Sequence, residues 1–181
     1  MEIVAFDTDD KADGSGKAGI TWISKTLLNT DTKYDVNGDA EKYSECDLRQ
    51  YLYDSIAPLI PSTVSTHIIP VTKVQATVSN NSTVQNGETT SETVWIPSAH
   101  EVATSQDYRE SIGATYHSRF TSASTRIKKT SDGAKHSWWL RSCATNEKAA
   151  FVDTTGATNS IYQYTRIASV SVYIALGFCT N

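Results

Sequence analysis

The side chains that most often carry catalysis or hold metals are few in this sequence and lie far apart. Four histidines lack the spacing of a metal site; they are His67, His100, His117 and His136. Three cysteines form no C-x-x-C pair; they are Cys46, Cys143 and Cys179. We interpret these cysteines as buried thiols, because free cysteine packs as a small hydrophobe. No local signature supports a catalytic Cys–His pair.

The segment 35–39 begins like a calcium-binding loop, because Asp35, Asn37 and Asp39 alternate along the chain. In such a loop the sixth position is glycine and the twelfth is a bidentate glutamate. Here those positions hold Ala40 and Cys46. We therefore expect a solvated turn, and the sequence predicts no metal, no cofactor and no enzymatic activity.

The tryptophans and one arginine are predicted to be structural. Trp22 and Trp95 lie in strand-like apolar runs, where core packing is the default role of an aromatic ring. Trp138 and Trp139 are adjacent, so on a strand they face opposite ways, and one must meet a second layer, a partner or a ligand. Arg141 shares the face of Trp139. We favour a buried arginine bonded to carbonyl groups or a carboxylate over a ligand contact.

Polar and aromatic residues of the C-terminal third form the candidate ligand-binding set. They fall on predicted turns or on the less apolar strand faces, and they are Asn146, Asn159, Tyr162, Tyr164 and Tyr173. Tyrosine offers a large contact area at low entropic cost, and asparagine offers adaptable hydrogen bonds. The alternative is an ordinary hydrophilic sheet surface.

The elements that must position these residues suggest an α+β fold in one domain over 1–181, because helices come first and a terminal antiparallel sheet follows. A helix is predicted over 45–57, opened by a capping box of Ser44 and Asp47, and a shorter helix is opened by Ser98 and Glu101. A protruding loop or hairpin is expected near 76–93. Strands are predicted over 20–24, 68–74, 138–142, 150–153, 161–167 and 169–178.

Composition limits the partners and the location. The 181 residues carry a net charge of −4, which argues against a nucleic-acid partner. No apolar run approaches the roughly 18 residues that a membrane helix needs. The N-terminus shows neither a basic nor an apolar region, so we expect no signal peptide and synthesis in the cytosol.

Four sequence blocks carry a resemblance to a known family. They are Gly19-Ile20-Thr21-Trp22-Ile23-Ser24-Lys25, Ser44…Leu48-Arg49…Leu52, Val94-Trp95-Ile96-Pro97-Ser98…Glu101-Val102 and Trp138-Trp139-Leu140-Arg141-Ser142. In this order the chain resembles uncharacterised domains of phages, prophages and surface proteins of gut Firmicutes. That family is similar to the C-type-lectin-like fold, which is shared with the formylglycine-generating enzyme and with receptor-binding proteins diversified by retroelements.

The resemblance implies a fold and a ligand face. Two helices would flank a twisted antiparallel sheet, and the C-terminal strands would display the ligand surface. The motifs of calcium-dependent lectins (Glu-Pro-Asn, Gln-Pro-Asp and Trp-Asn-Asp) do not occur, so metal-mediated sugar binding is not expected. The closely spaced cysteine pair of the formylglycine-generating enzyme is also missing.

Three functional hypotheses follow from the residues and the resemblance together. The first is a non-enzymatic binding module of a phage virion, at a tail tip, baseplate or capsid surface, that contacts a host-surface protein or glycan through its C-terminal face. It would assemble with other virion subunits as a homo-oligomer, a trimer being one option. The second is a structural decoration or fibre-attachment protein. The third is an oxidoreductase-like relative, which would need Cys143 and Cys179 to come together.

Overall fold

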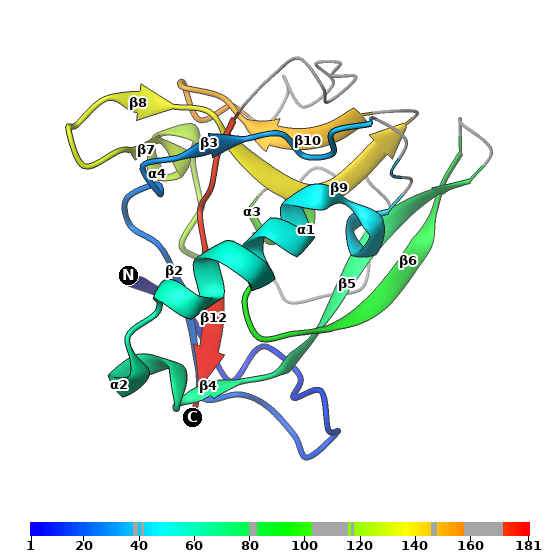
Figure 1. Cartoon of the computed structure of the whole chain (residues 1–181), viewed down its shortest axis with the longest axis vertical. Helices are drawn as coiled ribbons and strands as arrows, with labels where there is room; N and C mark the ends of the chain where they lie inside the picture. Colours follow the sequence, from blue (N-terminus) through cyan, green and yellow to red (C-terminus); the bar gives the residue numbers. More distant parts are fainter. Residues whose placement is uncertain are drawn as a thin grey trace.

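A computed structural model describes residues 1–37, 40, 42–79, 83–102, 116, 118–145, 148–157 and 172–181. For 75–79, 83–86, 143–145 and 148 it describes the backbone alone. Sheets dominate these parts of the chain and the helices are short, so the fold is a mixed α+β fold, as the sequence predicts (Figure 1).

Four sheets are formed within the described residues. One four-stranded sheet has the order β1-β2-β12-β4 and another has the order β10-β9-β11-β3, while β5 pairs with β6 and β7 pairs with β8. The strands are β1 (Glu2–Phe6), β2 (Ile20–Ile23), β3 (Asp31–Thr32), β4 (Ile68–Ile69), β5 (Val71–Ser79), β6 (Thr83–Glu92), β7 (Lys128–Lys129), β8 (Lys135–His136), β9 (Trp138–Thr145), β10 (Lys148–Val152), β11 (Val172–Tyr173) and β12 (Gly177–Thr180). The segment predicted to protrude, 76–93, lies mainly in the antiparallel β5–β6 pair, at the right of Figure 1.

The predicted helix over 45–57 is present, but it changes geometry along its length. It comprises η1 (Tyr43–Glu45), α1 (Asp47–Tyr51), η2 (Leu52–Ile56, a π-helical stretch) and η3 (Ala57–Leu59), and α2 (Ser62–Ser65) follows. The capping box predicted for this helix is wrong. The Ser44 hydroxyl donates to Glu88 at 2.6 Å, and the Asp47 carboxylate accepts the N–H of Val36 at 2.6 Å. Both side chains therefore bind partners elsewhere in the sequence instead of capping the helix.

The second predicted capping box is confirmed. The backbone N–H of Ser98 donates to Glu101 Oε2 at 2.8 Å, and the N–H of Glu101 donates to Ser98 Oγ at 3.2 Å. The helix that it opens, α3 (Ala99–Val102), is four residues long. One further short helix, α4 (Ala123–Arg126), is described in the part of the chain between α3 and β7.

The prediction of one continuous strand over 169–178 is wrong for its described part. The chain leaves β11 after Tyr173, crosses from one sheet to the other over Ile174–Leu176 and enters β12 at Gly177. Ser24 stabilises this crossing segment through two hydrogen bonds. Its N–H donates to the Leu176 carbonyl, and the N–H of Leu176 donates to Ser24 Oγ. The strand predicted over 161–167 lies outside the described residues.

Two hydrophobic clusters explain why the C-terminal pattern alternates. Ile174 and Leu176 pack in one cluster, whereas Ala175 and Cys179 pack in the other. The period of two therefore marks a segment buried on both sides rather than a strand with one apolar face. Within the described residues, no helix is long and apolar enough to cross a membrane.

Gly177 provides a test of this packing, because it lies directly against a tryptophan. A Cβ at Gly177 would overlap the six-membered ring of Trp95, at 2.6 Å from both Cε3 and Cη2. The two residues also exchange backbone hydrogen bonds, so neither backbone is free to move away. We expect Gly177→Ala to lower the free energy of unfolding by about 1–3 kcal/mol, the range for overpacked cores.

Urea unfolding of a double-mutant cycle separates this overlap from a general effect of alanine. The Trp95→Phe change shortens the ring, so Gly177→Ala should cost less in that background than in the wild-type chain. Equal costs in both backgrounds would show that the ring is not the obstacle.

Candidate functional site

A buried cluster of charged side chains lies where the N-terminal loop, β5, α3 and β9 meet. Its members are Asp9, Lys73, Glu101 and Arg141, each no more than 2% exposed. Two carboxylates and two cations make the set neutral in formal charge. Because an unpaired buried ion is very costly, these four side chains stabilise one another only when all four segments are in place.

Arg141 of β9 is held on several sides. Its guanidinium makes a two-pronged contact with Glu101, with Nη1–Oε2 at 2.6 Å and Nη2–Oε1 at 2.8 Å. It also donates to the carbonyl groups of Ile96 at 2.8 Å and Val74 at 3.2 Å. These contacts match the structural interpretation of Arg141, a buried arginine bonded to a carboxylate and to carbonyl groups.

Lys73 of β5 is the other cation of the cluster, and both carboxylates contact it. Its Nζ is in direct contact with Asp9 Oδ1 and lies 3.1 Å from Glu101 Oε1. The same atom donates to the Tyr116 hydroxyl at 2.6 Å and lies 3.6 Å from the centre of a Trp95 ring. The ammonium group is thus enclosed by two acids and two aromatic side chains.

The protonation states follow from this arrangement. Burial raises the pKa of the Glu101 carboxyl, but the charges of Arg141 and Lys73 outweigh burial and leave that pKa below its ordinary value. The Asp9 carboxyl behaves alike, since Lys73 more than offsets the effect of burial on its pKa. Both acids are therefore ionised at neutral pH.

Cys179 lies at the border of the cluster. Its thiol is buried and contacts Asp9 Oδ2 at 3.4 Å. Burial, together with the Asp9 charge, raises the pKa of this thiol to about 12. Because the thiolate is the reactive form of cysteine, Cys179 is inert as a nucleophile at neutral pH.

The tryptophans also occupy buried or half-buried positions. Trp138 and Trp139 are both fully buried, Trp138 in the cluster that contains Trp95 and Trp139 in the other. The sequence left three alternatives for one of these two rings: a second layer, a partner or a ligand. The structure shows a second layer, because each ring packs in its own hydrophobic cluster. Trp22 is half-buried and donates its Nε1–H to Thr180 at 3.1 Å.

Of the predicted ligand-binding set, Tyr173 is the member that the structure describes. It pairs with Trp138 and with Asp31 across neighbouring strands. Its half-buried ring stacks on the half-buried ring of His136, with ring centres 4.0 Å apart. Tyr173 also packs against the hydrophobic cluster that contains Trp95, so its ring is only partly exposed. Asn146, Asn159, Tyr162 and Tyr164 lie outside the described residues.

The described strand ends show how the predicted set is divided along the chain. Tyr173 and the end of β10 at Val152 both pair with Trp138, at the start of β9. Asn146 follows Thr145, at the other end of that strand. Seven steps of roughly 3.3 Å separate these two ends by about 23 Å. Residues 153–171, which contain three of the predicted residues, connect two strand ends on the Trp138 side.

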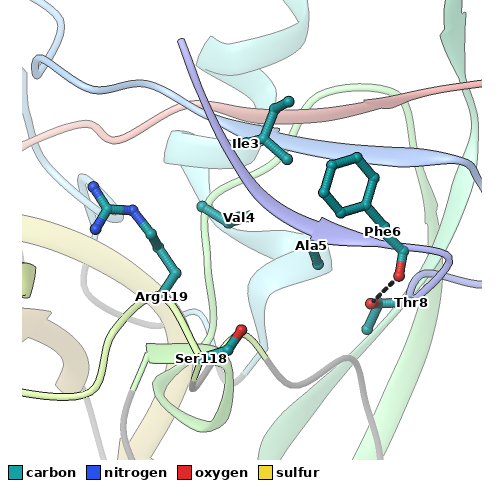
Figure 2. A pocket seen from close by; sticks show the side chains of 7 residues that line it. All are labelled: Ile3, Val4, Ala5, Phe6, Thr8, Ser118 and Arg119. Atoms are coloured by element: carbon teal, nitrogen blue, oxygen red, sulfur yellow. Dashed lines mark hydrogen bonds between the residues drawn. The ribbon is translucent and has the colours of Figure 1, made fainter.

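A cleft of about 430 Å³ lies beside β1, at the edge of its sheet. Figure 2 shows Ser118 and Arg119 facing the strand across this cleft, with Phe6 beside it. Arg119 is not free, because its Nε donates to Glu2 at 3.0 Å. Phe6 is 64% exposed, which is unusual for so large an apolar side chain.

A second, more apolar groove of about 530 Å³ lies between the helical segment and the C-terminal crossing. Its walls are built mainly from aliphatic and aromatic side chains of Met1, Leu28, Tyr51, Ile56, Leu59, Ile60, Val64, Leu176 and Phe178. Leu59 on its rim is 76% exposed. The groove offers a contact surface for another apolar surface, because it has no charged side chain in its lining.

Comparison of the sequence with models of protein families identifies the family of this chain. The model of the family described as "Domain of unknown function (DUF6273)" matches residues 18–175. The chain belongs to this family. Neither a curated protein nor a solved structure matches the chain. The matched range of the DUF6273 domain includes Lys73, Glu101 and Arg141, whereas Asp9 precedes it and Cys179 follows it.

Sequence reasoning missed the acidic half of the buried cluster and its lysine. Asp9 precedes the first of the predicted strands, and Lys73 is an ordinary residue near the end of the strand predicted over 68–74. Neither lies in a local motif, and 64 positions separate them. Glu101 was found only as a capping residue. Within the described parts of the DUF6273 domain, no group of three metal-ligating side chains is assembled.

The cluster predicts a specific sensitivity to acid. A carboxyl whose pKa is lowered by folding contributes stability above its unfolded pKa, and this contribution is lost as the pH falls through the folded value. We expect Glu101→Gln to destabilise the protein by about 3–5 kcal/mol at pH 7, because Arg141 would lose its anionic partner. We also expect the variant to lose less stability than the wild type when the pH is lowered below about 4.

Urea unfolding of both proteins across this pH range measures the two effects. Glu45→Gln is the matched control, because Glu45 is exposed and pairs with Lys42 at the surface. Its expected change is below about 1 kcal/mol. A Glu101→Gln variant as stable as the control would contradict the role given to the cluster.

Proposed function

We propose that this DUF6273 domain is a non-enzymatic binding module of a phage virion, and that it contacts a host-surface protein or glycan through its C-terminal face. The fold proposed for it is C-type-lectin-like. The virion assignment and that fold rest on the resemblance of the sequence blocks around Trp22, Trp95 and Trp138 to domains of phages and prophages.

The observation that carries the proposal is the stack of Tyr173 on His136. Aromatic rings that are partly open to solvent provide contact area, and their polar tips provide hydrogen bonds. The stack lies at the start of β9, where the end of β10 and Tyr173 of β11 both pair with Trp138. Asn159, Tyr162 and Tyr164 lie between these two strands in the sequence.

The scaffold beneath this face supports the same proposal. Trp138, which pairs with Tyr173, is fully buried and donates its Nε1–H to the Arg126 carbonyl at 3.0 Å. Three positions farther along β9, Arg141 is fixed by the buried charge cluster. A ligand face binds more tightly when it is carried by rigid elements, because less conformational entropy is lost on binding.

Binding of the purified protein to intact envelopes of candidate host bacteria tests the proposal. A variant with Asn159→Ala, Tyr162→Ala and Tyr164→Ala should lose most of the binding, and a chelator should not weaken wild-type binding. The matched control carries Ser65→Ala and His67→Ala, two exposed residues around the end of α2. Binding that the triple variant retains, or that the control also loses, would place the contact elsewhere.

A second candidate function is a structural decoration or fibre-attachment protein of the virion. The exposed apolar groove around Leu59 favours it, because large exposed apolar patches commonly mark subunit contacts. The occupant would be a second copy of this chain, which accords with a homo-oligomer. In that case the aromatic stack would serve assembly or solvation rather than a receptor.

Oligomeric state provides the test of this groove. We expect sedimentation experiments to show a homo-oligomer that Leu59→Asp dissociates, because a buried unpaired carboxylate would oppose the contact. Thr63→Asp is the control, since Thr63 is exposed and does not line the groove. A wild-type protein that stays monomeric at high concentration would contradict the subunit contact.

A further inference from the structure

We propose that Lys73 and Asp9 condense into an intramolecular isopeptide bond, and that Glu101 transfers the proton in this step. The proposal is independent of the function proposed above. It rests on the placement of an amine, a carboxyl group and a second carboxylate within one buried cluster. Glu101, the counter-charge of Arg141, also contacts this nitrogen and so places a second acidic group beside it.

The reacting groups are in contact and shielded from water. Lys73 Nζ touches Asp9 Oδ1, and the side chains of both residues are 1% exposed. The ring of Trp95 covers the nitrogen at 3.6 Å. The nitrogen and the carboxyl group are therefore held together in a site that bulk solvent does not reach.

The two oxygen atoms of Asp9 have different surroundings, which assigns their roles. Oδ1 faces Lys73 and is the oxygen that leaves. Oδ2 accepts a hydrogen bond from the Thr21 hydroxyl at 2.5 Å and faces the Cys179 thiol at 3.4 Å, whereas the Tyr116 hydroxyl lies 2.9 Å from both oxygens. These donors would stabilise the negative charge that develops on Oδ2 when the nitrogen attacks Cγ.

The atoms and protons of the step balance without a further reactant. Lys73 first gives one proton to Asp9 Oδ1, and its nitrogen lone pair then attacks Cγ of Asp9. Glu101, whose Oε1 lies 3.1 Å from Nζ, takes a second proton from that nitrogen. Glu101 then passes the proton to Oδ1, the Cγ–Oδ1 bond breaks and one water molecule leaves. Glu101 is an ionised carboxylate again at the end.

Two features of the cluster prepare Glu101 and the carboxyl group for this step. Arg141 holds Glu101 in a two-pronged contact, so the carboxylate begins the step ionised and oriented. The Tyr116 hydroxyl contacts both Lys73 Nζ and Asp9 Oδ1, which offers a second path between the nitrogen and the leaving oxygen. Fixed proximity of this kind corresponds to effective molarities of roughly 10⁵–10⁸ M, enough to favour an amide over separate groups in water.

Mass spectrometry of the denatured full-length protein tests the proposal directly. The wild-type chain should be lighter than its sequence by one water molecule, and digestion should yield a branched peptide that joins Asp9 to Lys73. A wild-type chain of full mass, or a water molecule lost at another position, would overturn the proposal. This measurement uses the wild-type chain and does not require any variant to fold.

Variants identify the role of each group. Lys73→Arg keeps the charge and should have full mass, and Glu101→Gln should slow the loss of water at least tenfold in freshly refolded protein. Asp9→Asn should lose ammonia rather than water, because the amide nitrogen then becomes the leaving group. Persistence of the water loss in Lys73→Arg would exclude Lys73 as the nucleophile.

A second buried lysine supplies the matched control. Lys128 Nζ contacts Glu2 Oε1 at 2.9 Å, but Glu2 is partly exposed, and Lys128 also donates to the Ser24 carbonyl rather than to a second acid. Lys128→Arg should therefore still lose one water molecule. Full mass in this control would show that the loss reports folding in general rather than the Lys73–Asp9 pair.

Discussion

The need to neutralise four buried charges in one place constrains the whole arrangement of this DUF6273 domain. Arg141 and Lys73 come from two strands, Glu101 comes from a short helix and Asp9 comes from the loop after β1. Removing any one of them leaves a buried ion without its counter-charge, which costs several kcal/mol. The segments that carry these residues are therefore coupled, and helix α3 is held by its glutamate more than by its four-residue length.

The same constraint explains why the strand β9 has a core on each side. Its position is fixed at Arg141, so the adjacent rings of Trp138 and Trp139 must fill opposite spaces, and both are fully buried. The C-terminal segment repeats this solution, because Ile174 and Ala175 alternate between the same two clusters. A chain rich in serine and threonine thus builds two modest cores around one strand rather than one large core.

Local signals in the sequence predicted local features well. The capping box of Ser98 and Glu101 and the opposite orientation of the two tryptophans both follow from spacing of one to three residues. Predictions failed where a distant partner competed. Ser44 has the type and spacing of a capping residue, but Glu88 binds its hydroxyl. The 169–178 pattern looks like one strand, because alternation cannot show that the chain passes from one sheet to another.

The buried cluster could not be predicted for the same physical reason. Lys73 and Asp9 find each other across 64 positions, and a charged residue at the end of a strand is ordinarily exposed. Only the C-terminal set of tyrosines and asparagines carried a compositional signal for function. Its one described member, Tyr173, lies at the surface end of the sheet and outside the cluster.

The proposed cross-link and the proposed ligand face lie in separate parts of this molecule. Asp9, Glu101 and Cys179, whose pKa values are shifted, are buried in or beside the charge cluster. The half-buried stack of Tyr173 and His136 lies outside this cluster, and Tyr173 pairs there with Asp31 of the neighbouring strand. The proposed cross-link would fix the fold from within, whereas the proposed ligand face would meet its partner at the strand end beside Trp138.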